Sequence, residues 1–198
     1  MRNFILIFSL FIFAHTAVNA QEYLYFGAKG GLNLSNMNSE YISDDKMRIG
    51  FHLGLLAEIP LTSRFAIQPE VLYSTQGTED ITNNVGFTTI KFKLDYIQVP
   101  ILAKIYLTES LSVELGPSLN FLVNESIDFG ETDFGNSFEF GGALGASYKL
   151  RGGFFVSARY IYGFTDAFDR DNINAYYGDL YSKKSHNYGL QLGVGFMF

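Results

Sequence analysis

The stretch HNYGLQLGVGFMF (186–198), which ends the chain, decides the fold class. Large apolar or aromatic side chains occupy every second position from Tyr188 to Phe198, and small or polar residues lie between them, with Met197 as the exception. Because successive side chains of a strand point to opposite faces, the stretch predicts a β-strand with one apolar face. Such a strand would aggregate at an open edge in water, whereas a closed barrel in a bilayer has no edge and covers that face with lipid.

Seven earlier segments repeat this alternation, so the sequence predicts an all-β fold, an eight-stranded antiparallel up-and-down transmembrane β-barrel. The expected strands are 23–34, 48–59, 64–76, 92–107, 111–123, 137–150, 154–164 and 186–198. Short turns are expected at 60–63, 108–110 and 151–153, and long polar connections at 35–47, 77–91, 124–136 and 165–185. In outer-membrane barrels the short turns face the periplasm, so with eight strands both termini are expected there.

Three prolines interrupt the alternation. Pro69, Pro100 and Pro117 fall inside expected strands, where proline removes a hydrogen bond of the ladder. We therefore expect a bulge or a strand end at each of these positions.

Residues 1–20 have the pattern of a secretory signal peptide. Arg2 precedes an apolar run at 4–13, and the residues at 18–20 predict cleavage before Gln21, which leaves one barrel domain at 21–198. A short N-terminal anchor helix is the alternative, although the apolar run is shorter than the roughly 20 residues of a membrane-spanning helix. The net charge of −6 argues against nucleic acid as a partner, and without cysteine the chain forms no disulfide.

A soluble eight-stranded barrel such as a lipocalin is the main rival architecture, because it would turn the apolar face inward around a ligand. The opposite face, however, carries many glycines and too few charges to solvate an exterior. The apolar face also ends in aromatic residues, which form girdles at both membrane interfaces. These are Tyr73, Phe121, Phe138, Tyr160, Tyr162 and Tyr188 toward the long connections, and Tyr148, Phe154, Phe196 and Phe198 toward the short turns. The pattern favours the membrane barrel.

With the apolar face outward, charged side chains point into the lumen. They are Lys29, Glu58, Glu70, Lys104, Glu114, Glu139, Lys149 and Arg159, with His52 nearby. Four are basic and four are acidic, and the interior of an eight-stranded barrel is only wide enough for its side chains. Because an unpaired buried charge is costly, we expect an ion-pair network that closes the lumen. An ion-conducting pore is the alternative, but a pore is expected to show excess charge of one sign.

Few residues indicate catalysis or metal binding. After cleavage His52 and His186 are the remaining histidines, and the sequence has no HxH, HExxH or cysteine cluster, so neither a metal site nor a cofactor is expected. His186 begins the last strand near the rim, where it could act with Ser182 or Ser185 in a hydrolase. A rim histidine within an aromatic girdle is the simpler interpretation, and no catalytic residue is assigned.

Two of the long connections are rich in carboxylates, namely Asp166, Asp169, Asp171 and Asp179 in 165–185, and Glu125, Asp128, Glu131 and Asp133 in 124–136. The default interpretation is a solvated surface. Binding of cations that bridge lipopolysaccharide is the alternative, although no EF-hand spacing appears. The last connection also holds three tyrosines that either pack onto the rim or anchor a partner: Tyr176, Tyr177 and Tyr181.

Several segments carry a family resemblance. They are FGAKGGLNLS (26–35), GFHLGLLAEIPLTSRFAIQPEVLYSTQG (50–77), LDYIQVPILAKIYL (94–107), GPSLNFL (116–122) and NYGLQLGVGFMF (187–198). Together they resemble the PorT-like outer-membrane β-barrel family of Bacteroidota-type Gram-negative bacteria, over nearly the whole chain after residue 20. The resemblance implies an outer-membrane location. The namesake of that family is a barrel required for type IX protein secretion and gliding, and the family defines no catalytic residues.

Three kinds of function stay open. We expect a non-enzymatic structural, assembly or partner-binding barrel in contact with outer-membrane lipid, the barrel-assembly machinery and envelope or secretion-complex proteins. A lipid-modifying hydrolase or acyltransferase with a site at the rim is one alternative. A small pore or an adhesin is the other.

The terminal strand is expected to pair with the strand at 23–34 and so to close the barrel. It also resembles the C-terminal signal that the outer-membrane assembly machinery recognises. The residues of this expected signal are Tyr188, Phe196 and Phe198.

Overall fold

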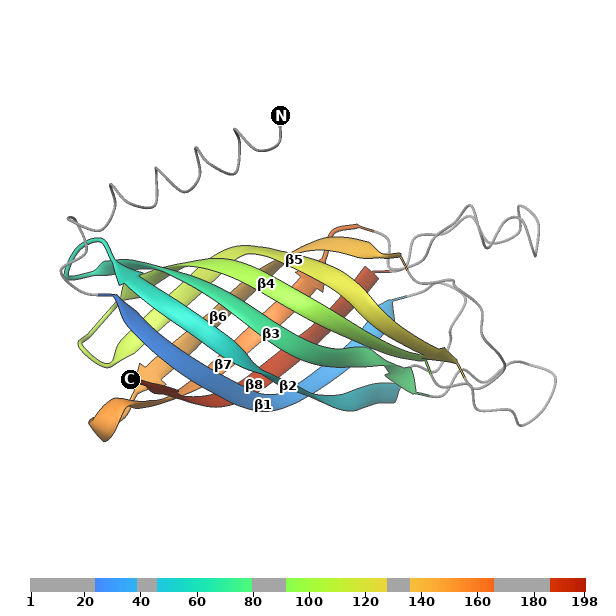
Figure 1. Cartoon of the computed structure of the whole chain (residues 1–198), viewed down its shortest axis with the longest axis horizontal. Coiled ribbons are helices and arrows are strands. Elements are labelled where there is room, and N and C mark those ends of the chain that lie inside the picture. The colour runs from blue at the N-terminus through green and yellow to red at the C-terminus, as the bar shows by residue number, and fades with distance from the viewer. Residues whose placement is uncertain (1–23, 39–45, 80–91, 128–135, 166–185) are drawn as a thin grey trace, which may run out of the picture.

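The computed structural model describes residues 24–38, 46–79, 92–127, 136–165 and 186–198. These residues form one closed barrel of eight antiparallel strands, in which each strand pairs with its neighbours in sequence and β8 pairs with β1 (Figure 1). The strands are β1 (Tyr25–Asn38), β2 (Lys46–Pro60), β3 (Phe65–Glu79), β4 (Phe92–Tyr106), β5 (Leu111–Ile127), β6 (Phe138–Lys149), β7 (Phe154–Gly163) and β8 (His186–Met197). The predicted fold, the strand number and the closing pair are confirmed.

The barrel has two different ends. Three tight connections lie at the end where the C-terminus is found, which we call the short-turn end (Figure 1). Two of them begin with a Leu-Thr pair, and Thr62 Oγ1 and Thr108 Oγ1 accept hydrogen bonds from the backbone N–H groups of Phe65 (3.1 Å) and Leu111 (2.9 Å). The third is the 3₁₀ turn η1 (Arg151–Gly153), where the positive φ of 76° at Gly152 favours glycine.

The opposite end, called here the long-connection end, differs from the predicted boundaries. β1, β3 and β5 continue to Asn38, Glu79 and Ile127, beyond the ends expected from the alternation. The prediction that the connections begin at residues 35, 77 and 124 is therefore wrong. Backbone pairing continues after the regular alternation of apolar and polar side chains stops, because ladder hydrogen bonds do not depend on the side-chain pattern. The segments 39–45, 80–91, 128–135 and 166–185 lie outside the described residues.

The expectation of a bulge or a strand end at each proline is also wrong. Pro69 pairs with Ile101 and Pro117 pairs with Gly142, and both lie inside continuous strands with an unchanged register. Among the strand pairs that the structure describes, the register shifts lie elsewhere. One is between Met47 and His52 in β2, and the other is at Asp95 in β4. In the ladder between β4 and β5, paired positions are missing between Pro100 and Ala103 without a slip. The barrel thus loses local pairing at a proline and keeps its register.

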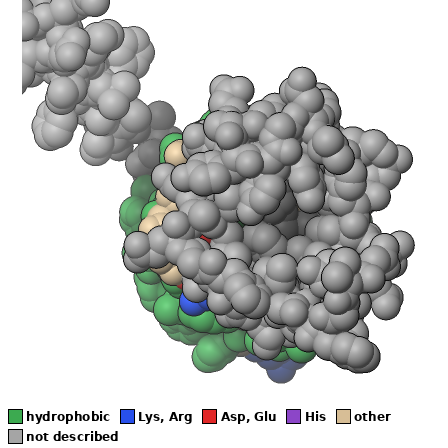
Figure 2. Space-filling model, turned by 90° about the vertical axis from the view of Figure 1, so that its right-hand side faces the viewer, with side chains coloured by type: hydrophobic (Ala, Val, Ile, Leu, Met, Phe, Trp, Pro, Cys, Tyr) green, Lys and Arg blue, Asp and Glu red, His purple; other side chains and the backbone are tan. Residues whose placement is uncertain are grey.

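The outer face of the barrel is apolar. Large aliphatic side chains of the wall are exposed, for example Ile49 (68%), Leu55 (64%) and Val194 (64%). In a water-soluble protein such side chains are usually buried. In the view onto the long-connection end, hydrophobic side chains cover the visible part of the barrel wall (Figure 2). No helix among the described residues is long and apolar enough to span a membrane. The exposed apolar wall is the surface that lipid covers in a membrane barrel.

Glycine makes the seam between β1 and β8 possible. Gly31 and Gly193 face each other across this seam on the lumenal side. A Cβ atom on Gly31 would lie 1.9 Å from the Leu192 carbonyl oxygen, and one on Gly193 would lie 3.1 Å from His52 Nε2. The strands therefore approach closely here, and side chains from other strands fill the space that the glycines leave.

Candidate functional site

The inner face of the barrel carries the charged side chains. Strand alternation places them opposite the apolar wall, and Lys29, Glu70, Glu114 and Arg159 are each at most 3% exposed. The structure groups most of the predicted lumenal charges into two layers stacked along the barrel axis.

The first layer, the central layer, is built around Arg159. Its guanidinium donates to both carboxylate oxygens of Glu70, with Nη1–Oε2 and Nη2–Oε1 distances of 2.9 and 2.8 Å. Nε and Nη2 also donate to Glu114 Oε1 at 3.1 and 2.8 Å. Lys29 Nζ lies 3.0 Å from Glu70 Oε2. This layer therefore holds two cations and two carboxylates in contact.

The second layer lies toward the short-turn end and is built around Glu58. Lys104 Nζ and Lys149 Nζ lie 3.0 and 3.1 Å from its two carboxylate oxygens. Tyr106 donates its hydroxyl hydrogen to the same carboxylate. The Lys149 side chain is 37% exposed, so this layer reaches the barrel opening.

Gln68 connects the two layers. Its Oε1 accepts a hydrogen bond from Lys104 Nζ at 2.8 Å, and its Nε2 donates to Glu70 Oε1 at 2.7 Å. A continuous chain of polar contacts therefore runs through the lumen from Lys149 to Lys29. Such a chain is stable only when all its members have partners.

The layers follow from the stagger of the strands. The central layer takes Lys29, Glu70, Glu114 and Arg159 from β1, β3, β5 and β7. The second layer takes Glu58, Lys104 and Lys149 from β2, β4 and β6. In a closed barrel with tilted strands, inward side chains at one height come from alternate strands. Residues far apart in the sequence thereby become neighbours.

Two of the predicted lumenal residues have no charged partner among the described residues. His52 Nδ1 lies 2.7 Å from Asn33 Oδ1, and His52 Nε2 has no hydrogen-bond partner there. Glu139 lies toward the long-connection end, where its Oε1 accepts a hydrogen bond from Asn120 Nδ2 at 2.9 Å. The structure thus places seven of the nine predicted lumenal residues in the two layers and separates His52 and Glu139 from them.

His186 lies at the rim. Its ring stacks on Tyr162, with 5.6 Å between centroids and 20° between planes, and its Nδ1 lies 3.0 Å from the Gly163 carbonyl oxygen. Ser182 and Ser185, the hydroxyls proposed to act with it, lie outside the described residues. No group of three or more His, Cys, Asp or Glu side chains is placed to hold a metal ion in the described part of the chain.

The residues of the expected C-terminal signal lie on the outer face of β8. Phe196 packs edge-on against Phe154 at a centroid distance of 4.9 Å, and Phe198 lies 6.0 Å from Phe196. Tyr188 pairs with Tyr162 across β7 and β8, near the opposite end of the strand. Phe154, Phe196 and Phe198 therefore form one contiguous aromatic patch at the short-turn end.

The sequence does not identify three buried polar residues of the barrel. Gln68 and Tyr106 contact the charged layers, but uncharged residues do not reveal their partners in a linear sequence. Strand alternation is the signal that finds both, because Gln68 shares a face with Glu70 and Tyr106 shares a face with Lys104. Asp95 is 1% exposed and contacts Lys93 at 3.3 Å. It lies at the register shift of β4, where alternation fails.

The apolar wall, the closed sheet and the polar lumen define an outer-membrane β-barrel. The chain belongs to the outer membrane protein beta-barrel domain family, whose model matches residues 19–169. No curated protein matches the sequence.

Solved outer-membrane barrels share the fold. Neisserial surface protein A is similar with a TM-score of 0.60 and 18% identity, over 89% of this chain and 100% of that protein. The attachment invasion locus protein Ail of Yersinia pestis, solved in complex with the heparin analogue sucrose octasulfate, is similar with a TM-score of 0.54 and 17% identity, over 88% of this chain and 99% of Ail. At these identities the similarity shows the fold alone.

Proposed function

We propose that this outer-membrane barrel is non-enzymatic, that its lumen is closed, and that it acts by binding a partner of the cell envelope. The observation that carries the proposal is the central layer, in which Arg159 binds Glu70 and Glu114 across the lumen. Each of these side chains is at most 2% exposed. The interior of an eight-stranded barrel is filled by such side chains, which leaves little room for a permeating ion.

The rim supports a structural role for His186. Its Nδ1 is engaged by a backbone carbonyl group and its ring by Tyr162. A general base in a hydrolase needs a nucleophile within hydrogen-bond reach and a group that orients it. Stacking within an aromatic girdle accounts for His186 without either. This favours the non-enzymatic proposal over a lipid-modifying enzyme.

The proposed partners follow from surface and sequence. Lipid covers the apolar wall, and the aromatic patch of Phe154, Phe196 and Phe198 supports recognition by the barrel-assembly machinery. The resemblance to PorT-like barrels supports contact with components of protein secretion. Ail was solved with an anionic heparin analogue, but the connections 39–45, 80–91, 128–135 and 166–185 contain eleven acidic and four basic residues. Their charge favours a cationic partner at the long-connection end.

Conductance tests the closed lumen. In a planar bilayer the purified protein should show no channel steps above background at neutral pH. The variant R159A/E70A/E114A, which removes three of the four charged side chains of the central layer and leaves Lys29, should show them and serves as the positive control. Steady conductance from the unmodified protein would overturn the closed lumen.

Co-purification tests the partner. In a mild detergent the protein extracted from its native membrane should elute with a defined envelope protein, in a complex larger than the barrel. Extraction as a lone monomer from cells in every growth condition would contradict the partner-binding part of the proposal.

A further inference from the structure

We propose that the lumen binds a hard divalent cation, Ca²⁺ or Mg²⁺, at the long-connection end through the carboxylate of Glu139. The inference goes beyond the proposed function, because it concerns a site on the other side of the central layer. Glu139 is 2% exposed, and its Oε2 has no hydrogen-bond partner among the described residues. Its Oε1 is fixed by the Asn120 amide at 2.9 Å. A buried carboxylate without a cation is costly, so this position favours a positive ligand.

A further acceptor oxygen lies at the same end. Asn187, which also lines the cavity, donates its amide to Gln76 Oε1 at 2.6 Å. This bond fixes the amide group, and Asn187 Oδ1 is left buried with no hydrogen-bond donor among the described residues. A carboxylate oxygen and an amide oxygen that both lack a donor favour a cation over an anion.

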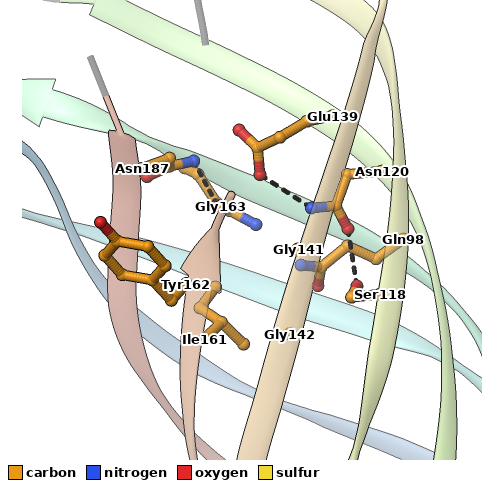
Figure 3. A pocket seen from close by; sticks show the side chains of 11 residues that line it. Gln98, Ser118, Asn120, Glu139, Gly141, Gly142, Ile161, Tyr162, Gly163 and Asn187 are labelled. Atoms are coloured by element: carbon orange, nitrogen blue, oxygen red, sulfur yellow. Dashed lines mark hydrogen bonds between the residues drawn. The ribbon is translucent and has the colours of Figure 1, made fainter. Parts of the chain in front are cut away.

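A cavity connects Glu139 with Asn187. It has room for about one water-sized group, and Gly163 forms part of its wall. A Cβ atom on Gly163 would lie 2.9 Å from Glu139 Cδ and 3.3 Å from the Asn187 backbone oxygen. Figure 3 shows Glu139 and Asn187 reaching this space from either side of Gly163, with Asn120 and Ser118 beneath the carboxylate. The missing side chain of Gly163 makes the space available.

The size and chemistry of the cavity select the ligand. Ligand pockets for drug-sized molecules measure roughly 300–1,000 Å³, whereas this cavity has room for about one water-sized group. It therefore suits a single ion rather than an oligosaccharide. Carboxylate, amide oxygen and water are the ligands of Ca²⁺ and Mg²⁺, whereas transition metals favour imidazole or thiolate. One carboxylate gives a weak site, for which we expect a Kd on the order of 1 mM, as in extracellular calcium modules.

The test is an unfolding titration of the full barrel in zwitterionic micelles free of lipopolysaccharide, after removal of metals with a chelator. Urea unfolding is followed by tyrosine fluorescence, since the chain has 13 tyrosines and no tryptophan. CaCl₂ or MgCl₂ at about ten times Kd should raise the folding equilibrium constant about tenfold over NaCl of equal ionic strength. The variant E139Q keeps an acceptor for Asn120 and should abolish this increase.

Two further variants separate this site from the acidic connections. E131Q removes a carboxylate outside the described residues and should leave the increase unchanged. N187D adds a second carboxylate and should lower the Kd about tenfold by calorimetry. The proposal is overturned if the unmodified protein shows no response to either cation, if E139Q responds as the unmodified protein does, or if N187D binds more weakly. These outcomes are independent of the conductance result.

Discussion

At the scale of single residues, Arg159 holds the lumen together. It is the cation with the most partners in the central layer, because its planar guanidinium donates to Glu70 through two nitrogens and to Glu114 through two. Lysine could not make this pattern, since its ammonium is a single point of charge. The geometry explains why an arginine, and not a lysine, bridges the two carboxylates of the central layer.

Replacing Arg159 should destabilise the barrel strongly. R159M leaves Glu70 and Glu114 buried with Lys29 as their nearby cation, and we expect the free energy of unfolding to fall by about 3–5 kcal/mol. Urea unfolding in micelles or lipid vesicles, followed by circular dichroism, measures the change.

A second variant identifies the cause. R159M/E114Q restores equal numbers of the two charges and should recover a large part of the lost stability. R151M, at an exposed arginine of η1, should change the free energy of unfolding by less than about 0.5 kcal/mol. If R159M and R151M behave alike, the central layer does not stabilise the barrel.

At the scale of the strands, the seam between β1 and β8 sets a limit on side-chain size. Gly31 faces the lumen, where a Cβ atom would lie 1.9 Å from the Leu192 carbonyl oxygen. The adjacent Gly30 faces outward, where a Cβ atom would meet the flexible end of Leu53 at 3.2 Å. The two neighbouring glycines of β1 therefore differ in whether they can be replaced by a residue with a side chain.

We expect G31A to destabilise the closed barrel by about 3 kcal/mol, near the upper range for an overpacked position, because a backbone oxygen must move. G30A should cost less than about 1 kcal/mol, because the Leu53 side chain can turn away. Electrophoresis of samples that are heated but not boiled gives a rapid comparison, because it shows the temperature at which the folded band is lost. Urea unfolding gives the free energies. Equal effects of both substitutions would mean that the close approach at the seam is absent.

The strands also show how far the sequence predicts the structure. Alternation located all eight strands and the face of every predicted lumenal charge, because one face meets lipid and the other does not. It missed the ends of β1, β3 and β5, where pairing continues although the regular alternation of apolar and polar side chains has stopped. It also misplaced the bulges. A proline such as Pro69 indicates that one backbone N–H donor is missing, but it does not indicate whether the ladder responds with a bulge or with a missing pair. The partners of each charge were not predictable, because they depend on the stagger between strands.

At the scale of the whole molecule, charge distinguishes the two ends. The short turns at 61–64, 107–110 and 150–153 contain one acidic and two basic residues, whereas the four segments beyond the other end contain eleven acidic and four basic residues. We propose that the long-connection end faces outward from the cell and that both termini face the periplasm, as in other barrels with this alternation of connections.

Single-cysteine labelling tests this orientation, because the chain has no cysteine of its own. T132C places a thiol in a long connection and E109C places one in an exposed short turn. On intact cells a membrane-impermeant maleimide should label T132C and leave E109C unlabelled, and both should react after the outer membrane is opened. Labelling of E109C alone on intact cells would invert the orientation.

The alternate-strand origin of the central layer also constrains how the molecule assembles. Lys29, Glu70, Glu114 and Arg159 are neighbours in the finished barrel, but β1, β3, β5 and β7 are separated along the chain. A chain that inserted one hairpin at a time would carry Glu70 and Glu114 into the bilayer before Arg159 arrived to neutralise them. Concerted insertion avoids these charged intermediates, so we expect the strands to close into a barrel as they enter the bilayer.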